Sequence, residues 1–315
     1  ADAKAVELEV VAEAERAYAE LWRRHEELAV YERDRELAAR FARVSEERYA
    51  TGASPQVDVL RSHVEVTRLL NRVETAKLAL LTAAARLNSI LSQAPETVLG
   101  VPEEPPALTL PDEPKALVAA ALERRPDLAA LRARVGGAEA AIASARLGLR
   151  PDFELSVSRF QNTGARDGFG ATAAVTLPFA WRAKYDAGIA EADAALAAAR
   201  SRVRSLEDRI GRDVSEALFA ARSASIRRDL FLDTHLPQSE QAMRSAASGY
   251  VAAAVDFTTL LETFRAVEMV HLEHAEASAD LGCAVADLDR AVGGDLPEIL
   301  AVGKPPAEYP QKEHR

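Results

Sequence analysis

Two histidines near the carboxyl end of the chain have a spacing that could hold a metal ion. His271 and His274 are three residues apart with Glu273 between them, so on a helix the two imidazoles would share a face. The competing interpretation is that His274 packs against another helix. The sequence contains two similar copies, described below, and the residue of the first copy that corresponds to His274 is the apolar Val73. We therefore predict no metal centre, and His271 and His274 are the candidates if one exists.

Recognisable catalytic motifs are absent from the sequence. Gly52-Ala53-Ser54 begins like the nucleophile elbow of a hydrolase, but Gln56 stands where that motif ends in glycine. The sequence also has no glycine loop for phosphate and no His-Glu-x-x-His motif for zinc. The lone Cys283 has no second cysteine with which to form a disulfide or a thiolate cluster. We predict that the chain is not an enzyme and needs no cofactor.

The composition favours long helices and argues against nucleic acid as a partner. Aromatic residues make up 5% of the chain and charged residues 28%, and alanine dominates the apolar set. This mixture is typical of helices that approach closely through small side chains. The net charge is -10, and lysine and arginine alternate with acidic residues instead of forming one basic face. No stretch has the roughly 20 apolar residues of a membrane-spanning helix.

The chain contains an internal duplication. When the sequence is shifted by 201 residues, Tyr49 falls on Tyr250 and Leu60 on Leu261 without a gap. A seven-residue apolar ladder then follows in the same frame in both copies, which is the pattern of a coiled-coil seam. The ladder positions are Val59, Val66, Val73, Leu80 and Leu87 in the first copy, and Leu260, Val267, His274, Leu281 and Leu288 in the second.

Each copy places a short break between two long helical stretches. The first break contains Gly52, Ser54 and Pro55, and the second falls at 252–255. We predict that each break is the tight turn at the tip of a long antiparallel helical hairpin. The predicted fold is therefore mainly α, with two long coiled-coil hairpins that arise from the duplication and one short β-hairpin.

The β-hairpin is predicted between the two copies. Apolar residues alternate with polar or small ones along two stretches of about nine residues, the length of a strand in a membrane barrel. The alternating apolar positions are Phe153, Leu155, Val157, Phe169, Val175 and Leu177. A soluble hairpin packed against a helix is the alternative interpretation.

These patterns divide the chain into four parts. Residues 1–94 form a first repeat with one helical hairpin, and residues 95–114 form a proline-rich linker. Residues 115–293 form the second repeat, with a leading helix, the β-hairpin at 152–177 and a long helical hairpin, and 294–315 form a tail. Under the 201-residue shift, the counterparts of residues 115–201 would fall before residue 1, so these residues have no counterpart in the first copy. We therefore expect the first repeat to lack its leading helix and β-hairpin, whether by natural truncation or otherwise.

Three stretches resemble the outer membrane efflux protein family, the TolC-like channels of tripartite exporters. They are ALERRPDLAALRARVGGAEAAIASARLGLRPDFELSVS (Ala121 to Ser158), YATGASPQVDVL (Tyr49 to Leu60) and VTLPFAW (Val175 to Trp181). The first resembles the family's helix that leads into a barrel strand, the second its hairpin tip, and the third its return from strand to helix. Together with the duplication, the resemblance covers nearly the whole chain.

The resemblance implies a homotrimer in the outer membrane and periplasm of a Gram-negative bacterium. Each subunit of the family contributes four strands to a barrel and long helices to a periplasmic tunnel, and its partners are a periplasmic adaptor and an inner-membrane transporter. This sequence offers two strands, so we expect the chain by itself to be soluble. The tips would be the surface for the adaptor, namely Gly52, Ala53, Ser54 and Pro55, and Ala252, Ala253, Ala254 and Val255.

The resemblance also implies an acidic gate just beyond the tips. Asp58 matches the family's pattern in the first copy and Glu262 matches it in the second, whereas Thr259 stands where the family often has aspartate. Asp256 is a further candidate that would compensate for Thr259. From the residues alone, Asp58 and Asp256 could equally be the N-caps of the helices that follow.

Two functions follow from these observations. The first is a passive outer-membrane channel of a tripartite efflux system, with metal cations or drugs as substrates. The alternative is a soluble periplasmic coiled-coil scaffold or adaptor without channel activity. The hairpin from Phe153 to Leu177 distinguishes them, because its apolar face would meet lipid in a channel and protein in a scaffold.

Overall fold

The computed structural model describes residues 2–105, 108–161, 168–177, 182–294 and 296, and it divides into two units. The larger unit comprises 3–124 and 210–315, and the smaller unit comprises 125–209 with the first two residues of the chain. The long helix α5 (Arg182–Leu230) has residues in both units. Each unit is described by itself.

The first helical hairpin of the larger unit consists of α1 (Asp2–Ala50) and α2 (Gln56–Ile90). Because α1 has 49 residues and a rise of about 1.5 Å per residue, it is roughly 75 Å long. It has no proline or glycine, and its many Ala, Glu and Arg residues are strong helix formers. Among the described residues, no helix has both the length and the apolar character needed to cross a membrane.

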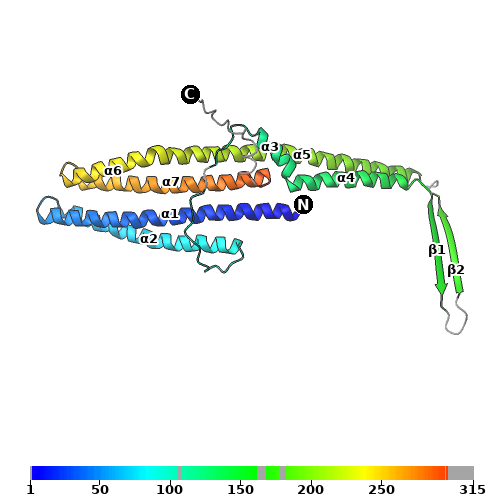
Figure 1. The fold of residues 1–315 in the computed structure, drawn as a ribbon, viewed down its shortest axis with the longest axis horizontal. Coiled ribbons are helices and arrows are strands. Elements are labelled where there is room, and N and C mark those ends of the chain that lie inside the picture. The colour runs from blue at the N-terminus through cyan, green and yellow to red at the C-terminus, as the bar shows by residue number, and fades with distance from the viewer. Residues whose placement is uncertain (1, 106–107, 162–167, 178–181, 295, 297–315) are drawn as a thin grey trace, which may run out of the picture. The chain divides into compact units, whose positions relative to one another are not determined.

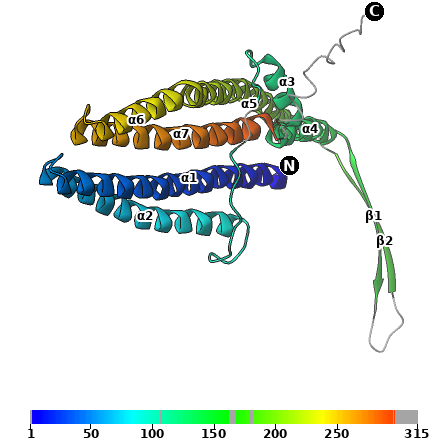
Figure 2. The same ribbon diagram turned by 60° about the vertical axis from the view of Figure 1, so that its left-hand side comes forward.

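The second helical hairpin repeats the first. Its leading arm is the end of α5, the π-helical turn η2 (Phe231–His235) and α6 (Leu236–Val251), and its returning arm is α7 (Phe257–Val292). Ala50 at the end of α1 corresponds to Val251 at the end of α6 under the 201-residue shift. Likewise Gln56 at the start of α2 corresponds to Phe257 at the start of α7. Figures 1 and 2 show the two hairpins side by side, so the predicted fold class is confirmed.

The π-helical turn was not predicted from the sequence. It lies directly before α6, which has Pro237 in its first turn. Proline has no backbone N–H and its ring clashes with the carbonyl of the preceding turn, so a regular α-helix cannot pass through this point undisturbed. A wider turn accommodates the proline while the arm continues.

The two helical hairpins share one apolar core. Leu69 and Val73 of α2 are fully buried together with Leu260 and Phe264 of α7, and Phe41 of α1 packs edge-on against Phe264 with ring centroids 6.0 Å apart. Small residues continue both seams away from the tips, and they are buried as well. These residues are Ala76, Ala83, Ala277 and Ala291. The predicted seams are therefore the contact surfaces of the helices.

The linker and α3 complete the larger unit. The described linker residues, 91–105 and 108–114, form no helix or strand. Asn88 at the end of α2 donates to the carbonyls of Pro95 and Thr97, at 3.1 and 2.9 Å, and so anchors the start of the linker. The helix α3 (Lys115–Arg124) follows and buries Leu117 and Ala121. Of the predicted tail 294–315, only residues 294 and 296 belong to the described part of the chain.

The smaller unit pairs α4 (Pro126–Leu147) with the first part of α5. Two ion pairs connect them: Arg132 to Glu207 at 2.9 Å and Arg200 to Glu139 at 2.8 Å. After α4 the chain forms β1 (Asp152–Phe160) and β2 (Gly168–Thr176), nine residues each. The turn predicted between the strands spans 161–168, of which 162–167 lie outside the described residues and Gly168 begins β2.

The strands pair antiparallel in a register that places most of the large apolar residues on one face, whereas Phe160 lies on the other. Phe153 lies opposite Val175, Leu155 opposite Ala173, and Val157 opposite Ala171. Leu177, which was assigned to the hairpin at 152–177, lies one residue beyond the end of β2. The strand pairing ends at Thr176 because its partner Asp152 is the first residue of β1.

Candidate functional site

The turns at the two hairpin tips have the same backbone conformation. In the first tip, Ala53 N–H donates to the carbonyl of Arg48 at 2.7 Å, and in the second, Ala254 N–H donates to that of Gly249 at 2.8 Å. These donors and acceptors correspond pairwise under the 201-residue shift. Two further hydrogen bonds of each turn correspond in the same way. The duplication has therefore preserved the turn itself as well as the helices.

One residue in each tip adopts a left-handed conformation. Gly52 has φ +74° in the first tip, and its counterpart Ala253 has φ +60° in the second. An alanine in this conformation costs about 1 kcal/mol relative to glycine, because its Cβ approaches the neighbouring carbonyl oxygen. Ala253 therefore stores backbone strain at an exposed tip, where strain is common in functional turns.

Arg48 connects the two tips. Its Nη1 donates to the carbonyl of Tyr250 at 2.6 Å and to that of Val251 at 3.2 Å, and its guanidinium lies 4.8 Å from the centre of the Tyr250 ring. In the second copy the same position is Gly249, where a Cβ would lie 2.6 Å from Val255. The two tips thus differ at this position. Arg48 of the first tip contacts the second tip, whereas the second tip has glycine because a larger side chain would clash with Val255.

Two of the predicted gate carboxylates, Asp58 and Asp256, lie near this contact. Asp58, in the first turn of α2, is partly buried, whereas Asp256 and Glu262 are exposed. Burial raises the pKa of Asp58, with a further rise from the charge of Asp256, while Arg61 and Arg48 oppose it. Asp58 and Asp256 therefore lie within electrostatic reach of each other. Glu262 lies further along α7, about one and a half turns into the helix.

The N-cap interpretation holds for one of the two aspartates and not for the other. Asp256 is the N-cap of α7, and its carboxylate accepts from the backbone N–H of Thr259 at 2.7 Å. This hydrogen bond is the main reason why the pKa of Asp256 is lowered. The N-cap of α2 is Pro55, so the N-cap interpretation was wrong for Asp58. The proline precedes the helix, and Asp58 is the third residue of α2.

A buried charge cluster lies further along the helices, and none of the sequence predictions includes it. Glu65 of α2 and Glu268 of α7 are 2% and 7% exposed. Arg68 donates to Glu268 through both terminal nitrogens, at 3.1 and 2.5 Å, and through Nε to Glu65 at 2.7 Å. Arg265 donates to the other oxygen of Glu65 at 2.6 and 3.1 Å. Burial by itself would lower the pKa of Arg68, but the two carboxylates outweigh it and raise that pKa.

A sequence signal for this cluster exists. Glu65 and Arg68 are three residues apart, and Arg265 and Glu268 have the same spacing with the charges in reverse order. Parallel helices that start at adjacent tips bring these pairs opposite each other. Arg68 pairs with Glu268 and Glu65 with Arg265, which are 200 residues apart. Aligning the two copies with the 201-residue offset therefore does not place these partners opposite each other.

The two candidate histidines are partly buried, and the charge of His274 acts on His271. His271 lies 3.8 Å from a carboxylate oxygen of Glu240, and burial, followed by the nearby Arg33, lowers the pKa of His271 to about 4. Burial also lowers the pKa of His274, whose Nε2 is buried without a hydrogen-bond partner in the described part of the chain. Across the described residues, no group of three or more His, Cys, Asp or Glu side chains could hold a metal ion.

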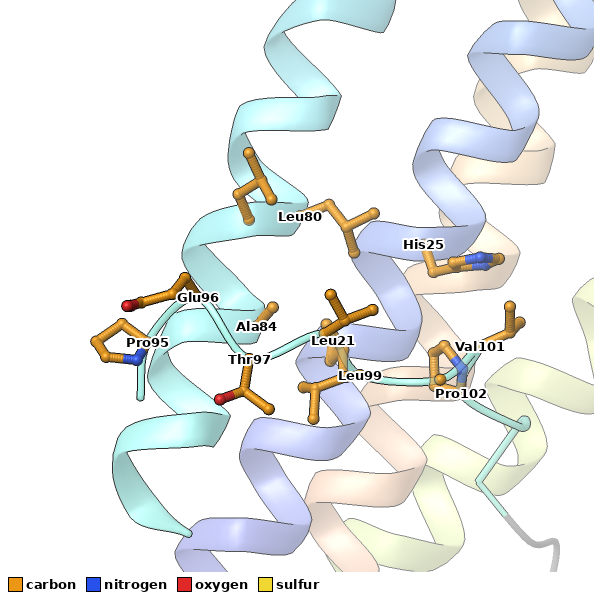
Figure 3. A pocket seen from close by; sticks show the side chains of 13 residues that line it. Leu21, His25, Leu80, Ala84, Pro95, Glu96, Thr97, Leu99, Val101 and Pro102 are labelled. Atoms are coloured by element: carbon orange, nitrogen blue, oxygen red, sulfur yellow. The ribbon is translucent and has the colours of Figure 1, made fainter. Parts of the chain in front are cut away.

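A further cavity of about 300 Å³ lies beside the first hairpin, between α1, α2 and the linker (Figure 3). Leu21 and His25 of α1 face the linker residues Leu99 and Val101 across it. The lining is mainly apolar, and its polar members are Glu96, Thr97 and His25. The Nδ1 of His25 is buried without a partner among the described residues. Such a lining suits a hydrocarbon group and offers no set of groups for acid–base or nucleophilic chemistry.

The β-hairpin presents one apolar face and one polar face. Phe153, Leu155 and Val157 are 75%, 79% and 78% exposed, and Phe169 is 75% exposed on the same face, with the guanidinium of Arg159 6.0 Å from its ring centre. The opposite face is mainly polar: it carries Asp152, Glu154 and Ser156 with their partners Thr176, Ala174 and Thr172, and Phe160 at the end of β1 is its exposed apolar residue. Large apolar side chains exposed in one patch mark a surface that contacts lipid or protein.

Solved structures have the same fold. A membrane protein from Pseudomonas aeruginosa is 21% identical with a TM-score of 0.78, and the comparison covers 93% of this chain and 68% of that one. The outer membrane protein VceC from Vibrio cholerae is 17% identical with a TM-score of 0.76, over 93% and 72%. The open state of the outer membrane channel MtrE from Neisseria gonorrhoeae is 19% identical with a TM-score of 0.70, over 92% and 67%. At these identities the likeness concerns the fold.

A sequence comparison adds the family. No curated protein matches the chain. The sequence profile of the family described as "Outer membrane efflux protein" matches residues 117–294, which is more than half of the chain. Members of this family are efflux channels at the outer membrane of Gram-negative bacteria and not enzymes, as predicted for this chain. The element order, with a β-hairpin between two duplicated helical hairpins along the chain, and the match over 117–294 lead to one conclusion: the chain belongs to the outer membrane efflux protein family.

Proposed function

We propose that this chain is the outer-membrane channel component of a tripartite efflux system and conducts substrate passively. It works as a homotrimer with a periplasmic adaptor and an inner-membrane transporter. The observation that carries the proposal is the pair of hairpin tips with one shared turn conformation, held side by side by Arg48. This double tip is an end surface of small, exposed residues, which another helical protein can approach closely.

The adaptor docks on this double tip. Gly52, Ala53 and Pro55 are exposed in the first tip, and Ala252, Ala253 and Ala254 are exposed in the second. Their short side chains leave the turn backbone accessible at the end of both hairpins. Ser54 and Val255 are partly buried and support the turns from inside.

Blocking the double tip tests the docking surface. We expect Ala53→Trp and Ala254→Trp each to weaken adaptor binding at least about tenfold, or about 1.4 kcal/mol. Both positions are exposed and have negative φ, so a large side chain adds bulk without backbone strain. Binding of the purified adaptor to immobilised protein, together with drug susceptibility of cells that depend on this chain, measures the effect.

The matched control is Thr82→Trp. Thr82 is also exposed but lies 26 residues beyond the start of α2, roughly 40 Å from the tip. It should leave adaptor affinity unchanged. If Ala53→Trp and Ala254→Trp bind the adaptor like the parent protein, the tips are not the docking surface. A scaffold without channel activity would bind the adaptor but give no ion conductance.

The carboxylates near the tips line the narrow end of the conduit. Asp58 and Asp256 influence each other electrostatically, and Glu262 is exposed on α7. Low-dielectric walls focus the field of such charges and raise the local concentration of cations. We propose that the conduit favours cationic substrates, either metal cations or positively charged drugs.

Neutralising these charges tests the selectivity. Asp58→Asn combined with Glu262→Gln should lower the cation-to-anion permeability ratio at least about twofold, because two negative charges per subunit leave the constriction. Reversal potentials in planar bilayers under a salt gradient measure the ratio. Glu32→Gln removes an exposed carboxylate from α1, away from the tips, and should leave the ratio unchanged. An unchanged ratio in the double variant contradicts the gate assignment.

A further inference from the structure

A third buried carboxylate adjoins the charge cluster of α2 and α7. Asp34 of α1 is 4% exposed. The charges that act on it are Arg33 of its own helix, Arg68 of α2 and Glu268 of α7. The cluster therefore contains three buried carboxylates, Asp34, Glu65 and Glu268. Of the three guanidinium groups beside them, those of Arg68 and Arg265 bond Glu65 and Glu268, and that of Arg33 reaches Asp34.

The hydrogen bonds show which of the three carboxylates has the fewest donors. Glu65 and Glu268 accept five hydrogen bonds from Arg68 and Arg265 between them. Asp34 receives one long hydrogen bond, from Nε of Arg33 to Oδ1 at 3.4 Å. Its Oδ2 is buried and has no partner in the part of the chain that the structure describes. A buried oxygen without a donor strongly disfavours the ionised form.

Asp34 consequently has an unusual affinity for a proton. Burial raises its pKa to about 6, and Glu268 adds to the rise while Arg33 and Arg68 oppose it. Further titratable groups lie near the neighbours of Asp34. Arg33 and Glu240 of α6 both act on His271 of α7, and Arg72 of α2 acts on Tyr31, which precedes Asp34 by one helical turn.

We propose that Asp34 is a proton-operated switch between the two helical hairpins: the protonated side chain stabilises their contact, and the ionised side chain weakens it. An ionised Asp34 is a third carboxylate that competes with Glu268 for Arg68, and the bonds between Arg68 and Glu268 join α2 to α7. A protonated Asp34 is neutral and can donate through Oδ2. The proposal concerns the contact between the hairpins and holds whether or not the chain conducts.

The pH range follows from the two states of Asp34. In the unfolded chain its carboxyl has the ordinary pKa of 3.8, and in the folded chain about 6. Between these values the folded protein binds the proton more tightly. The stabilisation is therefore complete below about pH 4 and is lost as the pH rises through about 6. The contact between the hairpins is expected to be tight at pH 5 and looser at pH 7.5.

Spin-label distances between the tips test the switch. The positions are Ala53→Cys and Ala254→Cys in a Cys283→Ser background, and labelled chain is diluted into unlabelled chain so that only distances within one subunit are read. We expect a narrow distance distribution at pH 5 and a longer or broader one at pH 7.5. Asp34→Asn should give the narrow distribution at both pH values, because it cannot ionise.

Two comparisons keep the test decisive. Glu32→Gln removes an exposed carboxylate two residues away and should respond to pH like the parent protein. Asp34→Ala, which also cannot ionise, replaces the asparagine variant if that variant does not fold. The proposal is overturned if the parent protein gives the same distribution at both pH values, or if a folded Asp34 variant keeps the full response.

Discussion

Replacing Arg68 by alanine is expected to lower the free energy of unfolding by about 3 to 5 kcal/mol, the range for breaking a buried ion pair. Glu268 would lose the bidentate partner that it has in the folded protein, and Glu65 would keep only Arg265. Both carboxylates would stay buried in the core that joins the two hairpins. Denaturant unfolding followed by circular dichroism measures the loss.

Two variants distinguish this effect from the loss of any arginine. Arg86 lies on the same helix and faces Glu13 at 4.0 Å, with both side chains largely exposed. Arg86→Ala should therefore cost less than about 1 kcal/mol. Arg68→Met combined with Glu268→Leu should recover most of the stability, because apolar residues of similar size replace a charged pair and Glu65 retains Arg265. Equal losses for Arg68→Ala and Arg86→Ala would contradict the role of the cluster.

An arginine on the apolar face of the β-hairpin is expected to block membrane assembly. Leu155 is 79% exposed in the middle of β1, with Phe153 and Val157 beside it on the same face. We propose that this face meets lipid. Arginine near the middle of a bilayer then costs about 2 to 4 kcal/mol per subunit. Leu155→Arg should strongly reduce the amount of protein recovered in outer-membrane fractions of cells.

The neighbouring residue provides the matched control. Ser156 is exposed on the opposite face and lies across from Thr172. Ser156→Arg introduces the same charge into the same strand and should leave the membrane fraction near the parent level. If both variants assemble normally, or both fail, the apolar face does not contact lipid.

Much of the fold could be predicted because its signals are local. The end of α1 and the start of α2 follow from Gly52 and Pro55. The strands follow from the alternation of apolar with polar or small residues over nine positions. The 201-residue shift then predicted the second hairpin, because the matching apolar ladders require the same helices on either side of the break. The second turn forms even with Ala253 in place of glycine. The tip residues and Asp58 could be singled out because they sit directly beside these breaks.

The buried charges could not be predicted in the same way. Whether Asp34 and Glu65 lie in a core or in solvent depends on which face of each hairpin meets the other, and charged residues of the same kinds occupy the exposed faces of α1 and α2. The contacts of Arg68 with Glu268 and of Arg48 with Tyr250 join residues about 200 positions apart. The sequence by itself determined helices, turns, strands and the repeat, because these depend on neighbours within a few residues. Only the packing of one hairpin on the other decided which charges are buried, because burial depends on the register and rotation of whole helices.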